Sequence, residues 1–278
     1  MVKLFWWKNT PSISNPRSIG KAFKRTFHYK LPFVFRNFGD ELSPVIIAKL
    51  TDQKVCFSDK PEKLVSLGSI LHLADSKDSV WGTGLLRENM IPRVKDISIF
   101  SVRGPLTKSA LVKNGYNCPS VYGDPGLLVP YLWKNESSPK YKIGVIPHWS
   151  QIRHLKKDSF DTKSINLIDV SNPWNKVIDD IQSCEIILST SLHGLILADA
   201  YNIPRAMFYI DTPPDSSWFK YEDYSASIDA TLVPYDSGGC MQDIVSLSEK
   251  AALNPVKNGI VEKLLEAAPF KLSRYSLN

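Results

Sequence analysis

The 278-residue sequence has few cysteines and none of the spacings that would give those cysteines a structural role. Its four cysteines are isolated from one another and form neither a CxxC pair nor a metal-binding pattern: Cys56, Cys118, Cys184 and Cys240. No disulfide framework is therefore implied, and Cys184 lies in an apolar segment as a small buried hydrophobic residue would. This usage is typical of a protein from a reducing compartment.

The sequence also lacks a long apolar run. No segment approaches the ~20 consecutive apolar residues that a membrane-spanning helix needs. The opening residues MVKLFWWKN have too short an apolar part for a signal peptide, because Lys8 interrupts it. We therefore expect a cytoplasmic protein without a membrane span.

Several motifs of common enzyme chemistry are missing. The sequence contains no GxGxxG or GxxxxGK[ST] phosphate loop and no GxSxG nucleophile elbow. It also contains no HxxxH or HExxH pair, so we expect neither a metal ion nor a bound cofactor. What remains is metal-free acid–base chemistry on an anionic substrate.

Basic residues are in modest excess, and many lie near the N-terminus. The formal net charge is +6, and the first 40 residues contain Arg17, Lys21, Lys24, Arg25, Lys30 and Arg36. Residues 10–36 are either a solvated loop or a surface that contacts an anionic membrane, a lipid-linked sugar or a polymer. No nucleic-acid-binding motif accompanies them, so we do not expect a nucleic-acid partner.

Short apolar runs alternate with helical patterns along the chain. Extended segments are expected at 2–7, 63–67, 79–81, 97–102, 121–122, 142–147, 164–170, 186–188 and 205–209. Helices are expected from residue 37 or 40 to 50, and at 104–114, 173–184, 193–202, 241–253 and 256–268. This alternation predicts an α/β protein with parallel sheets in two Rossmann-like domains that face a cleft.

A polar stretch with a proline, WKNESSPK, separates the two halves of the pattern. Stretches of this kind commonly connect domains. We therefore predict an N-terminal domain at residues 1–135 and a C-terminal domain at residues 140–278.

The most informative stretch is EIILSTSLHGLILADAYNIP at residues 185–204. An apolar strand-like run ends in three hydroxyl residues, and a helical pattern follows His193 and Gly194. Ligands of open α/β sheets bind at the carboxyl ends of strands, and helix N-termini attract anions. We therefore predict that His193 faces an anionic substrate; the alternative is a neutral histidine that only caps the helix.

Four loops combine glycine with polar residues at predicted strand ends or helix starts, and a shared cleft would explain all four. Single loops of this kind are often ordinary turns. The candidate cleft or acceptor residues are Asn37, Gly39, Asp40, Gly82, Thr83, Gly84, Asp124 and His148, the last of which follows a strand of the second half.

Arg103 is poorly placed to serve solubility, because it lies between a predicted strand and a predicted helix. Its planar guanidinium suits a two-point grip on a carboxylate or phosphate. The alternative is a structural salt bridge to Asp124 or Asp40.

Taken together, these stretches resemble the polysaccharide pyruvyltransferase family. The matching pieces occur in order over roughly residues 1–210: LFWWKN, NFGDELSP, GSILH, VWGTGL, VRGPLTKSAL, VYGDPGLLVP and LSTSLHGLILADAYNIP. The resemblance implies two domains arranged as in the GT-B glycosyltransferases, with Arg103 on the acceptor side and His193 on the donor side. It also implies that pyruvate moves from phosphoenolpyruvate onto two sugar hydroxyls to form a cyclic ketal.

The resemblance also assigns roles to residues. Arg103 occupies the arginine position of the VRGP motif and His193 the histidine position of the SLHG motif, whereas Ser191 stands where some relatives have a second arginine. Arg103 would bind one end of phosphoenolpyruvate, and the amides near Ser191, Leu192 and Gly194 the other. His193 would protonate the enol carbon, and we expect it to become charged mainly once the donor is bound.

Two other functions fit the same pattern: a GT-B nucleotide-sugar glycosyltransferase and a non-catalytic sugar- or anion-binding protein. The sequence leaves open the acceptor sugar, its linkage, the pair of hydroxyls and the oligomeric state. A polymer, a lipid-linked repeat unit or a nucleotide sugar would each be a reasonable acceptor. Three aromatic residues, Trp218, Tyr221 and Tyr224, would either stack on a sugar or pack in the core.

Overall fold

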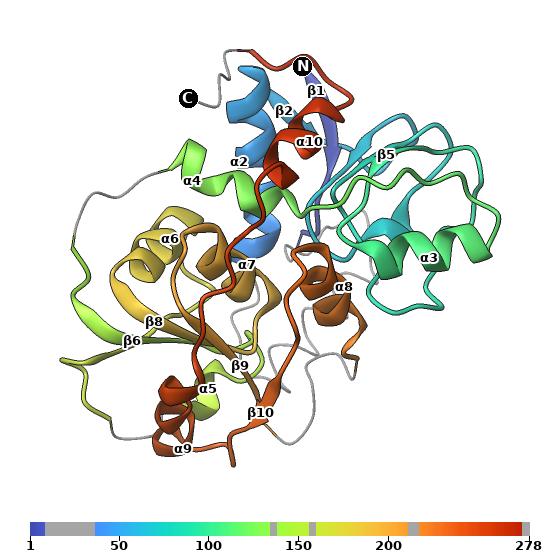
Figure 1. Ribbon diagram of the computed structural model, residues 1–278. Helices are drawn as coiled ribbons and strands as arrows, with labels where there is room; N and C mark the ends of the chain where they lie inside the picture. The colour runs from blue at the N-terminus through green and yellow to red at the C-terminus, as the bar shows by residue number, and fades with distance from the viewer. Residues whose placement is uncertain (9–36, 134–137, 156–159, 211–216, 274–278) are drawn as a thin grey trace.

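The strands form two parallel sheets, one from each half of the chain (Figure 1). The computed structural model describes residues 1–8, 37–133, 138–155, 160–210 and 217–273. Over these ranges each sheet has five strands, in the orders β2-β1-β3-β4-β5 and β10-β9-β8-β6-β7. The predicted α/β class with parallel sheets is confirmed.

The first sheet is built from residues 2–101 and, among the described residues, is accompanied by two helices longer than two turns. Its strands are β1 (Val2–Phe5), β2 (Val55–Phe57), β3 (Leu64–Val65), β4 (Ser79–Trp81) and β5 (Ser98–Ser101). The helical elements are α2 (Phe38–Thr51), the 3-10 turn η1 (Leu71–Leu73) and α3 (Pro105–Lys113). Next come η2 (Pro125–Leu128) and α4 (Val129–Leu132), which lead into the second half.

The second sheet follows the same plan. Its strands are β6 (Tyr141–Ile146), β7 (Ile165–Leu167), β8 (Cys184–Ser189), β9 (Arg205–Tyr209) and β10 (Pro234–Asp236). The helical elements are α5 (Ile152–Leu155), α6 (Trp174–Gln182), α7 (Leu192–Ala200), α8 (Phe219–Ser227), α9 (Met241–Ser246), η4 (Leu247–Lys250) and α10 (Ile260–Glu266).

The β8–α7 unit is deeply buried. Ile187 and Leu188 of β8 are fully buried, as expected for a strand covered on both faces. Helix α7 is apolar around most of its circumference, and most of its side chains from Leu192 to Ala198 contribute to the core. The start of α7 is therefore held firmly at the carboxyl end of β8, which is where His193 lies.

The two halves share one apolar core. A single buried cluster contains Leu4 and Phe38 from the first half together with Ile146 and Ile196 from the second. The C-terminal segment returns to the first half, where the indole nitrogen of Trp81 donates to the Leu264 carbonyl at 2.8 Å. Figure 1 shows α10 beside β1 and α2, close to the chain's N-terminus.

Several predicted boundaries differ from the structure. The helix expected at 241–253 is split into α9 and the 3-10 turn η4, and the helix expected at 256–268 is shortened to α10. Gly259 has φ +88°, a left-handed conformation that ends the extended segment and lets α10 begin one residue later. The strand expected at 121–122 is a single bridge between Val102 and Tyr122.

Helix α8 and strand β10 were not expected from the sequence. The α8 segment FKYEDYSAS has no aliphatic stripe of helical period, because its buried residues are mostly aromatic or polar. In the described ranges no helix is both long and apolar enough to cross a membrane. The basic segment 10–36 lies outside the described residues.

Candidate active site

His193 is the second residue of α7, and its ring lies directly against α2 of the first half. A Cβ atom added to Gly39 would come within 2.1 Å of the His193 Nδ1. The ring of Phe38 approaches the imidazole edge-on, with the ring centroids 6.3 Å apart. The glycine in α2 therefore makes room for the imidazole, and two elements far apart in sequence share this contact.

The imidazole of His193 is neutral in this environment. Burial, together with the positive charges of Lys220 and Arg103, lowers its pKa from 6.5 to about 3. Its Nε2 is buried and has no hydrogen-bond partner among the described residues. A histidine that served only as a cap would be bonded, whereas this one leaves a buried ring nitrogen unpaired next to two cations.

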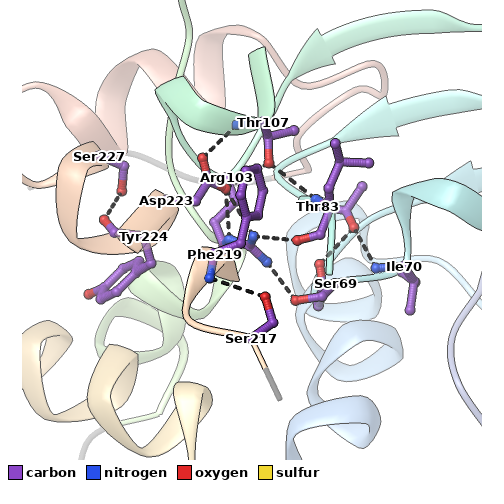
Figure 2. Close-up of polar contacts among 12 residues, drawn as sticks. Ser69, Ile70, Thr83, Arg103, Thr107, Ser217, Phe219, Asp223, Tyr224 and Ser227 are labelled. Carbon is purple, nitrogen blue, oxygen red and sulfur yellow. Dashed lines mark hydrogen bonds and ion pairs between the residues drawn. The ribbon is translucent and has the colours of Figure 1, made fainter. Parts of the chain in front are cut away.

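Arg103 is completely buried and makes several polar contacts (Figure 2). Its Nε donates to Asp223 Oδ2 at 3.0 Å, and its Nη2 lies 2.9 Å from the same oxygen. Nη2 also donates to the Leu85 carbonyl at 2.7 Å, and Nη1 donates to the Ser69 hydroxyl at 2.6 Å. The structural salt bridge given as the alternative for Arg103 is therefore present, but its partner is Asp223, and the expected partners Asp124 and Asp40 were wrong.

Asp223 binds the start of α3 as well as Arg103. Its Oδ1 accepts from the Thr107 amide at 2.8 Å, and its Oδ2 accepts from the Thr107 hydroxyl at 2.7 Å. Helix α3 has a glycine, Gly104, at its N-cap and so has no side-chain cap of its own. The Asp223 carboxylate, from a helix of the second half, provides that cap, and its negative charge interacts favourably with the positive N-terminal end of the α3 dipole.

Gly84 and Gly104 allow this cluster to pack closely. An added Cβ at Gly84 would come within 2.5 Å of the Arg103 guanidinium carbon, and one at Gly104 within 1.9 Å of the Asp223 carbonyl oxygen. Neither position has space for a side chain. Glycine is therefore required at these two positions by the buried ion pair between the two halves.

The remaining loops of the first half adjoin this cluster. An added Cβ at Gly82 would meet the ring of Pro125 at 2.4 Å. Thr83 is buried, and its hydroxyl donates to the Gly68 carbonyl at 2.7 Å. The loops at 82–84, 102–105 and 122–126 are thus in contact with one another around Arg103, whereas the loop at 37–40 contacts His193.

Asp124 is buried with one carboxylate oxygen unpaired. Its Oδ1 accepts from the Gly126 amide at 2.8 Å and caps η2, whereas Oδ2 has no partner in the described part of the chain. Burial raises its pKa from 3.8 to about 6, although the Gly126 amide and the charge of Arg103 oppose this shift. Asp124 therefore titrates close to neutral pH.

The other candidates lie at the two helix starts or on a neighbouring loop. The Asn37 Nδ2 donates to Asp40 Oδ2 at 3.0 Å at the start of α2. The backbone amide of His148 donates to the Thr190 hydroxyl at 2.6 Å, and its Nδ1 lies 2.8 Å from the Ser150 hydroxyl. His148 is thus connected to the loop that precedes His193.

The start of α7 is itself tightly packed. The Ser191 amide donates to the Ser189 hydroxyl at 2.9 Å, and an added Cβ at Gly194 would lie 2.4 Å from the same hydroxyl oxygen. Ser191 is the N-cap but makes no side-chain capping bond, and Leu192 is buried. Close packing rather than side-chain capping therefore sets the direction of the first amides of α7.

Comparison with known families shows which family the chain belongs to. Residues 12–212, well over half of the chain, match the family described as polysaccharide pyruvyl transferase. The chain belongs to the polysaccharide pyruvyl transferase family. His193 and Arg103 both lie within the matched residues, and Lys220 and Asp223 lie beyond them.

Two relatives extend this finding. The chain is 34% identical over 158 residues to the succinoglycan biosynthesis protein ExoV of Rhizobium meliloti (strain 1021). The aligned stretch covers 56% of this chain and 48% of the relative. It is 28% identical over 201 residues to an uncharacterized protein of Acanthamoeba polyphaga mimivirus, covering 66% of this chain and 69% of the relative. The match thus spans about half the length of the bacterial relative. No solved structure matches the chain.

In this member of the polysaccharide pyruvyl transferase family, α8 carries the three aromatic candidates of the sequence together with two charged residues that the sequence did not point to. The Tyr221 hydroxyl donates to the Thr190 carbonyl at 2.8 Å, and the Tyr224 hydroxyl donates to Asp199 Oδ2 at 3.0 Å. Both tyrosines are buried core residues, whereas Trp218 is partly exposed. A lysine and an aspartate spaced three apart, Lys220 and Asp223, carry no recognisable motif.

Proposed function

We propose that the protein transfers pyruvate from phosphoenolpyruvate onto two hydroxyls of a hexose in a cell-surface polysaccharide or its precursor. The product is a cyclic ketal, and phosphate is released. The observation that carries the proposal is the buried, neutral imidazole of His193, whose Nε2 is unpaired among the described residues and lies within electrostatic reach of Arg103 and Lys220. We further propose that the two halves act as in the GT-B fold, the first binding the acceptor and the second the donor.

Phosphoenolpyruvate suits a site with these charges. Its phosphate carries about −1.5 to −2 charges at neutral pH, and its carboxylate adds one more. Among the described residues, Nη1 of Arg103 is bonded only to the Ser69 hydroxyl, so its second N–H is left to donate to a donor carboxylate. The amides of Ser191, Leu192 and Gly194 at the start of α7 would bind the phosphate.

The chemistry then follows from the proton on His193. Burial is the main cause of the low pKa of His193, and the two neighbouring cations lower it further; an anion in the site offsets those cations and so favours the imidazolium. The imidazolium protonates the enol methylene carbon, and an acceptor hydroxyl attacks the adjacent carbon, which acquires cationic character. That hydroxyl's proton passes to the imidazole, and the imidazolium so formed protonates the phosphate, which leaves with the C–O bonding pair. The second hydroxyl then attacks the same carbon and closes the ketal, and its proton returns the imidazole to the imidazolium.

Other groups would bind the acceptor. Asn37, Asp40, Asp124 and His148 are the polar candidates near the helix starts. The reaction as written needs no cofactor besides the donor. Substitution of His193 by Ala should lower turnover by roughly 10²- to 10⁴-fold, as loss of a general acid does.

The decisive experiment combines the purified protein with phosphoenolpyruvate and a panel of hexosides. We expect a saccharide product whose mass matches a pyruvate ketal, and phosphate release only when both substrates are present. Stabilisation by a nucleotide-diphosphate sugar but not by phosphoenolpyruvate would instead indicate a glycosyltransferase. Binding of phosphoenolpyruvate without any product across the panel would indicate a binding protein.

A further inference from the structure

Lys220 is a buried lysine at a point where α8 contacts both halves of the protein. Lys220 is only 7% exposed. Lysine is rarely buried unless its charge is compensated by another group. It lies in the first turn of α8, and its Nζ is 5.0 Å from the centre of the Tyr221 ring. The position of this charge is therefore set by the same helix that contacts the rest of the site.

Two neighbouring residues fix the direction of α8. The Tyr221 hydroxyl is bonded to the Thr190 carbonyl, three residues before His193, and the Asp223 carboxylate is bonded to Arg103. Lys220 thus lies directly before two anchored residues of α8. Tyr221 contacts the loop before His193, and Asp223 contacts the guanidinium of Arg103. Figure 2 shows the Asp223 side of this arrangement, with α8 next to the Arg103 cluster.

Apart from Lys220, the described groups around His193 supply little net positive charge to a donor. The charge of Arg103 is already balanced by a completely buried carboxylate, Asp223, at 2.9 Å. The start of α7 offers amides but no cation, because Ser191, Leu192 and Gly194 are uncharged. A donor with two or three negative charges therefore needs a further positive group near the imidazole, since burying an unpaired charge is costly.

We propose that Lys220 is that group: its ammonium binds the phosphate of the donor next to His193, while Arg103 binds the carboxylate. This inference rests on the proposed function. An ammonium is a compact point charge and suits a phosphate, whereas the planar guanidinium suits a carboxylate. The same placement lets a bound donor cancel the Lys220 charge that His193 otherwise feels, so donor binding and protonation of the acid are coupled.

The test measures phosphoenolpyruvate binding by calorimetry and the His193 imidazole titration by NMR in Lys220→Met. We expect the dissociation constant to rise by 10- to 100-fold, and the His193 pKa in the free protein to rise because a neighbouring positive charge is gone. Lys220→Arg keeps the charge and should lose less than Lys220→Met. Lys176→Met removes an exposed lysine, paired with Asp180 on α6, and serves as the control for net charge.

The outcomes separate the two proposals. A wild-type protein that does not bind phosphoenolpyruvate contradicts the proposed function and this assignment with it. A wild-type protein that binds it, with a folded Lys220→Met variant that binds within twofold, contradicts the assignment alone. If Lys220→Met does not fold, Lys220→Gln provides the same comparison, because it removes the charge and keeps a hydrogen-bonding end.

Turnover gives a second measurement. If Lys220 binds the donor, its removal should raise the KM for phosphoenolpyruvate more than it lowers kcat measured at saturating donor. A merely structural lysine would lower both through a smaller folded fraction, without a selective effect on the donor. Equal changes in the KM values for donor and acceptor would contradict the assignment.

Discussion

The imidazole of His193 rests on the Cα of Gly39, and no side chain fits between them. A methyl group at position 39 would lie 2.1 Å from Nδ1, far inside van der Waals contact. Gly39 belongs to the first turn of α2 and His193 to the first turn of α7, so the two helix starts meet at this point. The position of the proposed acid is therefore controlled from the opposite half of the molecule.

Substitution of Gly39 by Ala should separate stability from activity. Alanine favours a helix by about 1 kcal/mol over glycine, which offsets part of the strain of moving the ring. Displacing a catalytic group by about 1 Å commonly costs about 100-fold in rate, so we expect a loss of at least that size with a melting temperature near that of wild type.

Ser43→Ala, one turn further along α2, is the matched control for Gly39→Ala. Ser43 is buried, and its hydroxyl is unpaired within the described ranges, so its removal should leave activity unchanged and stability equal or slightly higher. Full activity in Gly39→Ala would show that the imidazole does not need its present position.

Acid should destabilise the protein through His193. Its pKa is about 3 in the folded protein and 6.5 for a solvated histidine, so the unfolded chain binds the extra proton first as the pH falls. The loss of folding free energy begins near pH 6.5 and grows until about pH 3, reaching roughly 3 kcal/mol at pH 4.5. Urea unfolding of wild type and His193→Gln at pH 4.5 and 7 should show a smaller pH dependence in the variant; equal slopes would contradict the neutral buried imidazole.

Asp124 should act in the opposite direction. Its pKa is raised from 3.8 to about 6, so the folded protein holds its proton more tightly, and stability falls as the pH rises from about 4 to 6. Asp124→Asn keeps the oxygen that accepts from Gly126 and removes the buried charge. The free energy of unfolding of Asp124→Asn minus that of wild type, measured with urea, should therefore be about 1 to 3 kcal/mol larger at pH 7 than at pH 4. A constant difference over this range would place the Asp124 carboxylate in a more polar environment.

The Arg103–Asp223 pair should show strong coupling in a double-mutant cycle. Removing either partner leaves the other charge buried and unpaired, which commonly costs about 3 to 5 kcal/mol. We therefore expect Arg103→Met and Asp223→Leu each to be strongly destabilised, and the double variant to be more stable than the sum of the two predicts. Additive single effects in this cycle would show that the pair does not hold the halves together.

Asp223→Asn tests the second role of this carboxylate. The amide keeps an acceptor for Thr107 at the start of α3 but loses the charge that faces Arg103. An intermediate loss of stability in urea unfolding would assign part of the effect to the cap and part to the ion pair.

Much of the architecture followed from local pattern alone. Alternating apolar runs and helical patterns predicted the parallel sheets, and the strand–turn–helix at 185–204 predicted His193 at a helix start. These features are encoded by neighbours in sequence, because a buried strand and the helix that follows it each show their own period. The motifs around Arg103 and His193 also carried the resemblance to the family that the comparison then showed.

The contacts between the halves depended on the tertiary structure. Arg103 pairs with Asp223, 120 residues away, rather than with the nearer Asp40 or Asp124. Asp223 and Lys220 lie on α8, a helix without an aliphatic stripe, so no period in the sequence marked it. The sequence by itself determined where most of the helices and strands form, whereas only the folded chain decided which charges face one another, because ion pairs form between surfaces that packing brings together.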